Sequence, residues 1–160
     1  LIIDKRLNGQ YQTWVLTAAF GDNLFEVAMS LAIQSGFTDN ELATLKQLEI
    51  LLNYNGYGAT IDDLFFRPAK LFEKLLTFAT PFDFLADDQE THQVLAEGYT
   101  HDMTLANKSP ILHETNDIVI IQLPDEACAR RVSGVFSNDL ANNYPDRADA
   151  TLTNDSDVSF

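Results

Sequence analysis

The residue best suited to chemistry in this sequence is Asp22, a single carboxylate at the end of an apolar segment. Residues 14–20 carry no charge, and Asp22 follows them between Gly21 and Asn23. Folds commonly place a metal ligand or a catalytic group there, because the buried segment fixes the carboxylate. An aspartate just before an apolar-periodic segment also caps a helix, since its oxygen accepts a bond from a free N–H group. From the residues alone both interpretations stay open, and the cap is favoured.

A second candidate is the segment 130–138, which combines two arginines with small polar residues. Its members Arg131, Ser133 and Asn138 follow a predicted strand and lie on a predicted helix. Backbone N–H groups early in a helix bind anions, so we predict these three residues as substrate contacts. No glycine-rich phosphate loop precedes the segment, however, and Gly134 falls inside the helix. A close packing contact at Gly134 is an equally good explanation.

Three histidines are scattered along the chain: His92, His101 and His113. None has a second His or Cys at a spacing typical of metal sites, so we interpret them as surface or structural residues. Neighbours on a helix point to different faces, which argues against a pairing of His101 with Asp102. The acidic pairs at 62–63 and 87–88 lie near predicted helix starts, where the helix dipole stabilises carboxylates.

The composition limits the class of protein. The chain has 160 residues, of which 46% are hydrophobic, enough for the core of one domain or of two small lobes. The chain has 10 Lys and Arg residues and 24 Asp and Glu residues, which gives a net charge of −14. Such an acidic surface disfavours binding to long nucleic acid. A small phosphorylated substrate stays compatible, because a bound divalent cation inverts the local potential.

The cysteine content and the hydropathy pattern indicate where the protein resides. No apolar run approaches the ~20 residues that span a bilayer, so we expect no membrane partner. Cys128 is the only cysteine, which suits a reducing cytosol, and we predict a cytoplasmic protein. We expect Cys128 itself to pack as a small apolar residue on a helix.

Residues 24–107 have the pattern of a mostly helical block. Helix starts are indicated by four signals: Thr38 with Glu41, Thr60 with Asp63, Pro68, and Asp87 or Asp88. Gly36 ends the first helix of the block, and 53–58 must be a turn because Asn-Gly tolerates positive φ. Before the block, residues 1–7 read as the end of a helix closed by Asn8-Gly9. Residues 13–20 are either a buried helix or a strand.

The pattern changes near residue 110. It then predicts a strand at 118–121, a helix opened by Pro124-Asp125 and ended by Tyr144-Pro145, and a strand at 148–153. The β-branched run of the first strand is typical of burial on both faces. Residues 154–157 read as a turn into a third strand. Two strands joined by a helix form a βαβ unit, for which we expect parallel strands and a right-handed crossover.

Four segments of the chain resemble DHH-type phosphoesterases, in the same order: residues 1–7, 14–24, 53–58 and 131–142. The resemblance spans nearly the whole chain, and it rests on the order of the four segments rather than on any one of them. It implies an α/β fold, a helix-rich fragment with a C-terminal strand–helix–strand unit, cut from a two-domain parallel-sheet protein. The implied parts are the end of the metal-binding catalytic domain at 1–36, a helical connector at 37–109, and the start of the C-terminal substrate domain at 110–160.

The resemblance also implies a chemistry. In that family, aspartates and histidines from four motifs hold two divalent metals, usually Mn²⁺, with Mg²⁺ as an alternative. Asp22 matches the aspartate of the fourth motif, which makes it the expected metal ligand and catalytic residue. Hard cations prefer oxygen ligands, and a hydroxide between two of them attacks the phosphorus of a small phosphodiester or nucleotide in line. One carboxylate cannot hold such a centre, so we expect the fragment alone to be inactive.

An interaction module without catalytic activity is the alternative. In that case the acidic helical block at 24–107 binds a basic partner, and the strand–helix–strand unit is a scaffold. An Asp-His-His triplet upstream of residue 1 would favour the enzyme. The oligomeric state stays open, with a homodimer among the expected assemblies.

Overall fold

The computed structural model describes residues 5–21 and 24–153, and the chain divides into two compact units. Unit 1 comprises Leu1–Asn53 and Pro68–Gln93, and unit 2 comprises Tyr54–Arg67 and Val94–Phe160. Each unit therefore draws on two separate stretches of sequence. The three parts implied by the resemblance, at 1–36, 37–109 and 110–160, concern a longer protein and stay a prediction.

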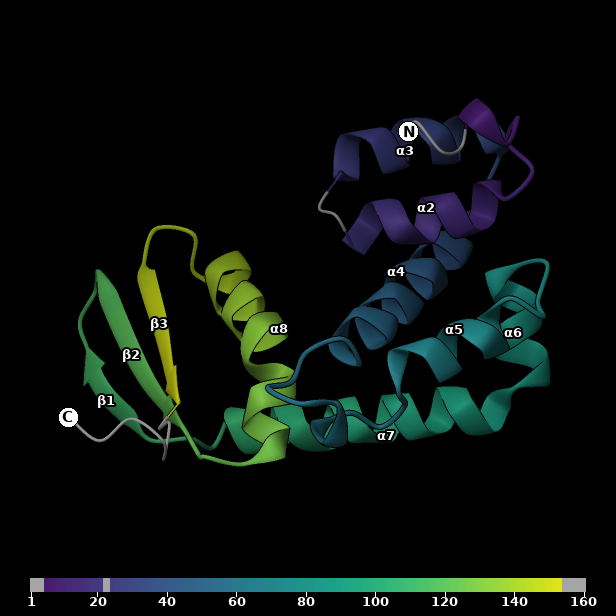
Figure 1. Ribbon diagram of the computed structural model, residues 1–160. Helices are drawn as coiled ribbons and strands as arrows, with labels where there is room; N and C mark the ends of the chain where they lie inside the picture. Colours follow the sequence, from purple (N-terminus) through teal and green to yellow (C-terminus); the bar gives the residue numbers. More distant parts are fainter. Residues whose placement is uncertain (1–4, 22–23, 154–160) are drawn as a thin grey trace. The chain divides into compact units, whose positions relative to one another are not determined.

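The chain is mixed α/β and rich in helix (Figure 1). Its elements are, in order, α2 (Gln12–Gly21), α3 (Phe25–Ser35), α4 (Asp39–Tyr54), the 3₁₀ helix η1 (Ile61–Asp63), α5 (Pro68–Leu75), α6 (Pro81–Asp87), α7 (Gln89–Ala106), β1 (Ile111–Glu114), β2 (Ile118–Leu123), α8 (Ala127–Asn143) and β3 (Ala148–Thr153). None of the described helices has both the length and the apolar composition needed to cross a bilayer.

The core of unit 1 forms around α2, which settles the open choice between helix and strand at 13–20. Leu16 and Ala28 are completely buried there, and Leu45 of α4 joins them. This burial explains the helix: its apolar side chains occur on most sides, as expected of a helix packed within a core. α2 contacts both α3 and α6.

Capping residues set several helix boundaries as predicted. The Glu41 carboxylate accepts a bond of 2.8 Å from the Thr38 N–H, and the Thr38 hydroxyl accepts one of 3.3 Å from the Glu41 N–H, just where α4 begins. Asp88 caps α7 by accepting a bond of 3.2 Å from the Thr91 N–H. Gly36 ends α3 with a φ of 74°. A left-handed residue there lets its N–H reach carbonyls of the last turn.

Two local predictions need correction. The turn predicted at 53–58 is present, with the Tyr57 N–H bonded to the Tyr54 carbonyl at 3.2 Å, but it begins later because α4 runs to Tyr54, and none of its residues has a positive φ. The Asn55 side chain bonds both the N–H and the C=O of Phe66, and these bonds, rather than a left-handed residue, hold the loop. Helix α8 begins one residue later than predicted, with Glu126 rather than Asp125 as N-cap and without a side-chain cap bond. Asp125 pairs with Arg130 instead.

Unit 2 contains a three-stranded sheet in the order β1-β2-β3. β2 and β3 are parallel and are joined through α8, which confirms the predicted strand–helix–strand unit. β1 was not predicted and pairs antiparallel with β2, so the described sheet is mixed rather than purely parallel. Helix α8 lies along β3 (Figure 1). The turn predicted at 154–157 and the third strand predicted after it fall outside the described residues.

The burial of β2 corrects the expectation of a strand enclosed on both faces. Val119, Ile121 and Leu123 are buried and pack with α8 residues such as Val132 and Phe136. Their neighbours alternate with them and are less buried, with Ile118 43% exposed. Because every second residue is buried, one face of β2 packs into the core and the other does not.

Candidate functional site

The predicted substrate residues lie on α8 in unit 2, where two arginines meet two buried carboxylates. We call this group the arginine–carboxylate cluster; its members are Tyr54, Asp63, Asp102, Arg130 and Arg131. They come from the end of α4, from η1, from α7 and from the first turns of α8. Four elements far apart in the sequence therefore converge on one set of charges.

Arg131 is enclosed by acceptors. Its Nε and Nη2 both lie 2.8 Å from Oδ2 of Asp102, and its Nη1 donates a bond of 2.6 Å to the backbone carbonyl of Asp63. The guanidinium carbon lies 4.4 Å from the ring centroid of Phe65, a cation–π contact. The Arg131 side chain is only 13% exposed. Its nitrogens are thus occupied within the unit.

Asp102 is the most deeply buried carboxylate of the cluster, with a side chain that is 0% exposed. Besides Arg131, it accepts a bond of 2.6 Å from the hydroxyl of Tyr54. Burial by itself raises the pKa of Asp102, but the bonds from Arg131 and Tyr54 outweigh burial and hold this pKa below its usual value. Burial, together with the bond to Asp102, raises the pKa of Tyr54 far above 10. Asp102 therefore carries a negative charge inside the unit, and Tyr54 stays neutral.

Arg130 forms the other half of the cluster with Asp63. Its Nη2 and Nε donate bonds of 2.9 and 3.0 Å to the two oxygens of Asp63, a bidentate pair. Asp63 Oδ2 also accepts bonds from the backbone N–H groups of Ala59 and Thr60. The bond from Arg130 holds the pKa of Asp63 well below its usual range. The helix-cap interpretation of Asp63 is confirmed, with an ion pair in addition.

The three predicted substrate residues do not converge. Ser133 directs its hydroxyl to the backbone carbonyl of Arg130, at 3.2 Å, and Asn138 lies exposed further along α8. Seven residues separate Arg131 from Asn138, which is two helical turns or ~10 Å along the axis. Only Arg131 belongs to the cluster, and its contacts favour a structural role. Substrate binding by Arg131, Ser133 and Asn138 stays a prediction.

The close packing contact predicted at Gly134 is present. A Cβ built on Gly134 would lie 3.1 Å from Cε1 of Tyr57, closer than ordinary van der Waals contact. This observation supports the packing explanation of the small residue rather than an anion site. Cys128 also packs as predicted, because it is buried and its burial raises the pKa of the thiol.

His101 and Asp102 are in contact, contrary to the argument from helix faces. Nδ1 of His101 lies 3.1 Å from Oδ1 of Asp102, while the His101 side chain stays 69% exposed. Asp102 was not among the predicted site residues, although an acid in an apolar-periodic helix is a usable signal of a buried pair.

Asp22, the predicted metal ligand, lies outside the described residues. Gly21 before it is the last residue of α2. Among the residues that are described, no group of three or more His, Cys, Asp or Glu side chains could hold a metal ion. The predicted Mn²⁺ or Mg²⁺ would therefore need most of its ligands from elsewhere.

Comparison of the chain with models of protein families, with curated proteins and with solved structures gave no significant match.

Proposed function

We propose that this chain is part of a metal-dependent, DHH-type phosphoesterase that hydrolyses a small phosphodiester or nucleotide. In this proposal Asp22 is a metal ligand. The ordered resemblance of four segments supports the family, and the helix-rich α/β chain with its parallel β2–β3 pair is compatible with it.

One structural observation carries the assignment of Asp22. The alternative role of Asp22 is that of a helix cap, and the residue at the N-cap position of α3 is Leu24. The preceding helix is anchored, because Leu16, Ala19 and Phe20 are 0%, 1% and 6% exposed. An acid placed directly after an anchored helix is well suited to bind a cation.

The metals would supply a nucleophilic hydroxide and charge neutralisation at the phosphate. A single carboxylate does not bind two ions, so the proposal requires further aspartates and histidines from the rest of a longer protein. We expect the 160-residue chain to be inactive by itself for this reason. The contacts of Arg131 support a positioning role in which it holds α8 against α7 and η1.

The proposal is tested on the intact protein that contains this chain. We expect Mn²⁺-dependent hydrolysis of a short oligonucleotide or of a cyclic dinucleotide. The Asp22→Asn variant should lose about 100-fold or more of the activity, because even residues that only support metal ligands cost up to this much. Asp87→Asn is the matched control, since Asp87 is an exposed aspartate at the end of α6 in the same unit.

Two results would overturn the assignment. Full activity in Asp22→Asn would remove Asp22 from the metal site, and equal losses in Asp22→Asn and Asp87→Asn would point to a general effect of charge. Calorimetric titration with Mn²⁺ gives a second readout, in which the intact protein binds two ions.

The competing proposal is an acidic interaction module, and the net charge of −14 favours it. Such a module would bind a basic partner through helices of the segment 24–107. It has no reason to bind two Mn²⁺ ions, so the same calorimetric titration separates the two proposals.

A further inference from the structure

Three helices of unit 1, α2, α4 and α5, surround a pocket of about 650 Å³. Small-molecule sites in proteins typically measure about 300–1,000 Å³. Its lining residues are Tyr11, Trp14, Thr17, Ala18, Gly21, Glu49, Leu52, Asn53, Phe72, Leu75, Leu76 and Phe78.

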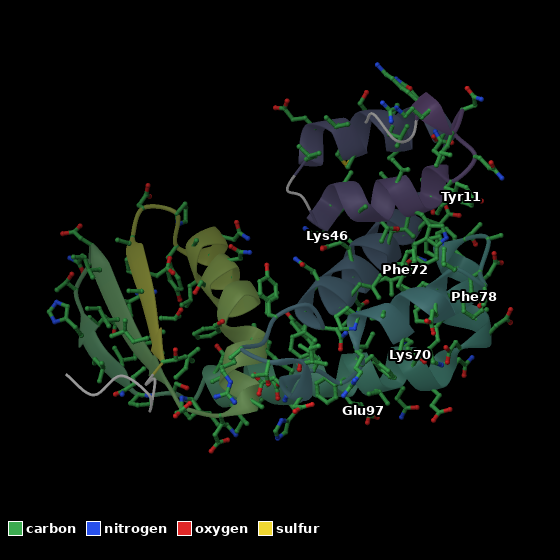
Figure 2. The ribbon with its side chains drawn as sticks, viewed as in Figure 1. Tyr11, Lys46, Lys70, Phe72, Phe78 and Glu97 are labelled. Atoms are coloured by element: carbon green, nitrogen blue, oxygen red, sulfur yellow. The ribbon has the colours of Figure 1, made fainter. Side chains whose placement is uncertain are left out.

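Aromatic rings dominate the wall of this pocket. Tyr11 and Trp14 come from the region of α2, and Phe72 and Phe78 come from α5 and the segment after it. Figure 2 shows Tyr11, Phe72 and Phe78 on these segments. Flat rings favour flat ligands, because aromatic pairs stack or meet edge to face.

Large apolar side chains are left exposed at the pocket. Phe72 of α5 is 61% exposed, and Leu76, which follows α5, is 67% exposed. Exposed apolar surface of this kind commonly marks a binding site. A ligand that covers Phe72 and Leu76 would gain the free energy of removing them from water.

The polar groups of the wall are largely used within the unit. Nε1 of Trp14 donates a bond of 3.3 Å to the carbonyl of Phe78, and the Thr17 hydroxyl donates one of 2.9 Å to the carbonyl of Thr13. Among the described residues that line the pocket, Glu49 is the one with a charge, and none is a lysine or arginine that could receive the head group of a fatty acid or a phosphate. The surplus of acidic residues in the chain also repels anions.

We propose that this pocket binds an uncharged, flat aromatic molecule. The ring system lies against Trp14 and Phe72, and the aliphatic side chains of Leu52, Leu75 and Leu76 cover its edge. The proposal does not rest on Asp22 or on any metal.

The probe for the test is N-phenyl-1-naphthylamine, which is neutral, aromatic and fluorescent. Trp14 is the only tryptophan of the chain and lines the pocket, so it serves as the reporter. We expect saturable quenching of Trp14 emission with a matching rise in probe emission, at one probe per chain.

Two variants locate the binding. Leu76→Lys places an ammonium group at the pocket wall and should weaken binding by about tenfold or more, because a charge is costly to bring into an apolar site. Ile33→Lys is the matched control: Ile33 is 76% exposed on α3, is not part of the pocket, and should leave binding unchanged. Phe72→Ala should also weaken binding, and it provides a second variant if the first does not fold by circular dichroism.

Several results would overturn the proposal. These are the absence of saturable binding, equal binding by wild type, Leu76→Lys and Phe72→Ala, or an equal loss in Ile33→Lys. A dimer whose dissociation opens the site would also overturn it, because a second copy of the chain would then be the occupant. Light scattering over a range of protein concentrations detects that case.

Discussion

At the scale of single residues, the arginine–carboxylate cluster contains the strongest electrostatic contacts of unit 2. Asp102 is buried and charged, and the guanidinium of Arg131 is its counter-ion at 2.8 Å. A buried pair gains little over an apolar replacement of both partners, but loss of one partner leaves an unpaired charge inside the protein. Replacing both partners by apolar residues should therefore change the stability of unit 2 less than replacing only one of them.

This asymmetry gives a prediction for Arg131. Arg131→Met should lower the free energy of unfolding by about 3–5 kcal/mol, because Asp102 then remains buried without its counter-ion. The double variant Arg131→Met with Asp102→Leu should recover much of this loss. Urea unfolding followed by far-UV circular dichroism measures both values.

Arg67→Met is the matched control for this experiment. Arg67 is an exposed arginine of the same unit, and its replacement should change the free energy of unfolding by less than about 0.5 kcal/mol. A loss of under 1 kcal/mol in Arg131→Met would contradict the buried-pair explanation, as would a double variant less stable than the single one.

At the scale of elements, α7 approaches the 54–67 loop so closely that one of its residues must lack a side chain. A Cβ on Gly98 would lie 2.5 Å from Cζ of Phe65, well inside van der Waals contact. Phe65 in turn lies against Arg131 and Tyr54. The ring of Phe65 thus fills the space between α7 and the charged cluster.

We predict that Gly98→Ala destabilises the protein by about 1–3 kcal/mol, the usual cost of overpacking. Alanine gains about 1 kcal/mol of helix propensity over glycine, so a purely local effect would have the opposite sign. Gly134→Ala is the comparison, because its closest neighbour, Tyr57, lies at 3.1 Å and must move only a few tenths of an ångström. Thermal unfolding of both variants tests this; a more stable Gly98→Ala would disprove the contact.

Local sequence patterns predicted most of the helices and strands, but few of the residue pairs that contact each other across the fold. Capping at Thr38, Thr60 and Asp88 depends on neighbouring residues, which a sequence displays directly. Strand β1 was missed because Ile111–Glu114 is short and exposed, so it lacks the alternation that marks a half-buried strand. The pairing of Asp63 with Arg130 spans 67 residues and depends on the tertiary fold, which no periodicity encodes.

In the candidate sites, too, single residues could be predicted but their contact partners could not. The sequence indicated that Arg131 is important, yet its partners Asp102 and Tyr54 appear only in the folded unit. The pocket at Trp14 could not be predicted, because the apolar residues of α5 have the same pattern whether they face a core or water.

At the scale of the whole molecule, stability should depend on pH through carboxylates that include Asp63, Asp88 and Asp102. Their pKa values all lie below the usual 3.8 in the folded protein. The unfolded chain therefore binds protons more readily than the folded one in acid. The stabilisation is fully present above pH 3.8 and is lost as the pH falls through the lower, folded-state pKa values.

We predict that the free energy of unfolding falls steeply below about pH 4. The gap between wild type and Asp63→Asn should be wide at pH 6 and should shrink steadily as the pH falls below about 4 toward the low folded-state pKa of Asp63, because the unfolded wild type then takes up a proton that the folded protein, paired with Arg130, does not bind. Asp62→Asn, which removes a charge at the exposed neighbouring position, is the matched control. Urea titrations at several pH values measure these gaps, and a constant gap for Asp63→Asn would contradict the prediction.

The solitary indole of Trp14 gives one half of this chain an optical signature of its own. Trp14 belongs to unit 1 and donates a hydrogen bond there, whereas Tyr54 and Tyr99 meet edge to face in unit 2. Emission from the indole follows the melting of one unit, while near-ultraviolet ellipticity of the phenol pair follows the other. A mismatch between these two melting curves would reveal that the halves unfold as separate cooperative blocks.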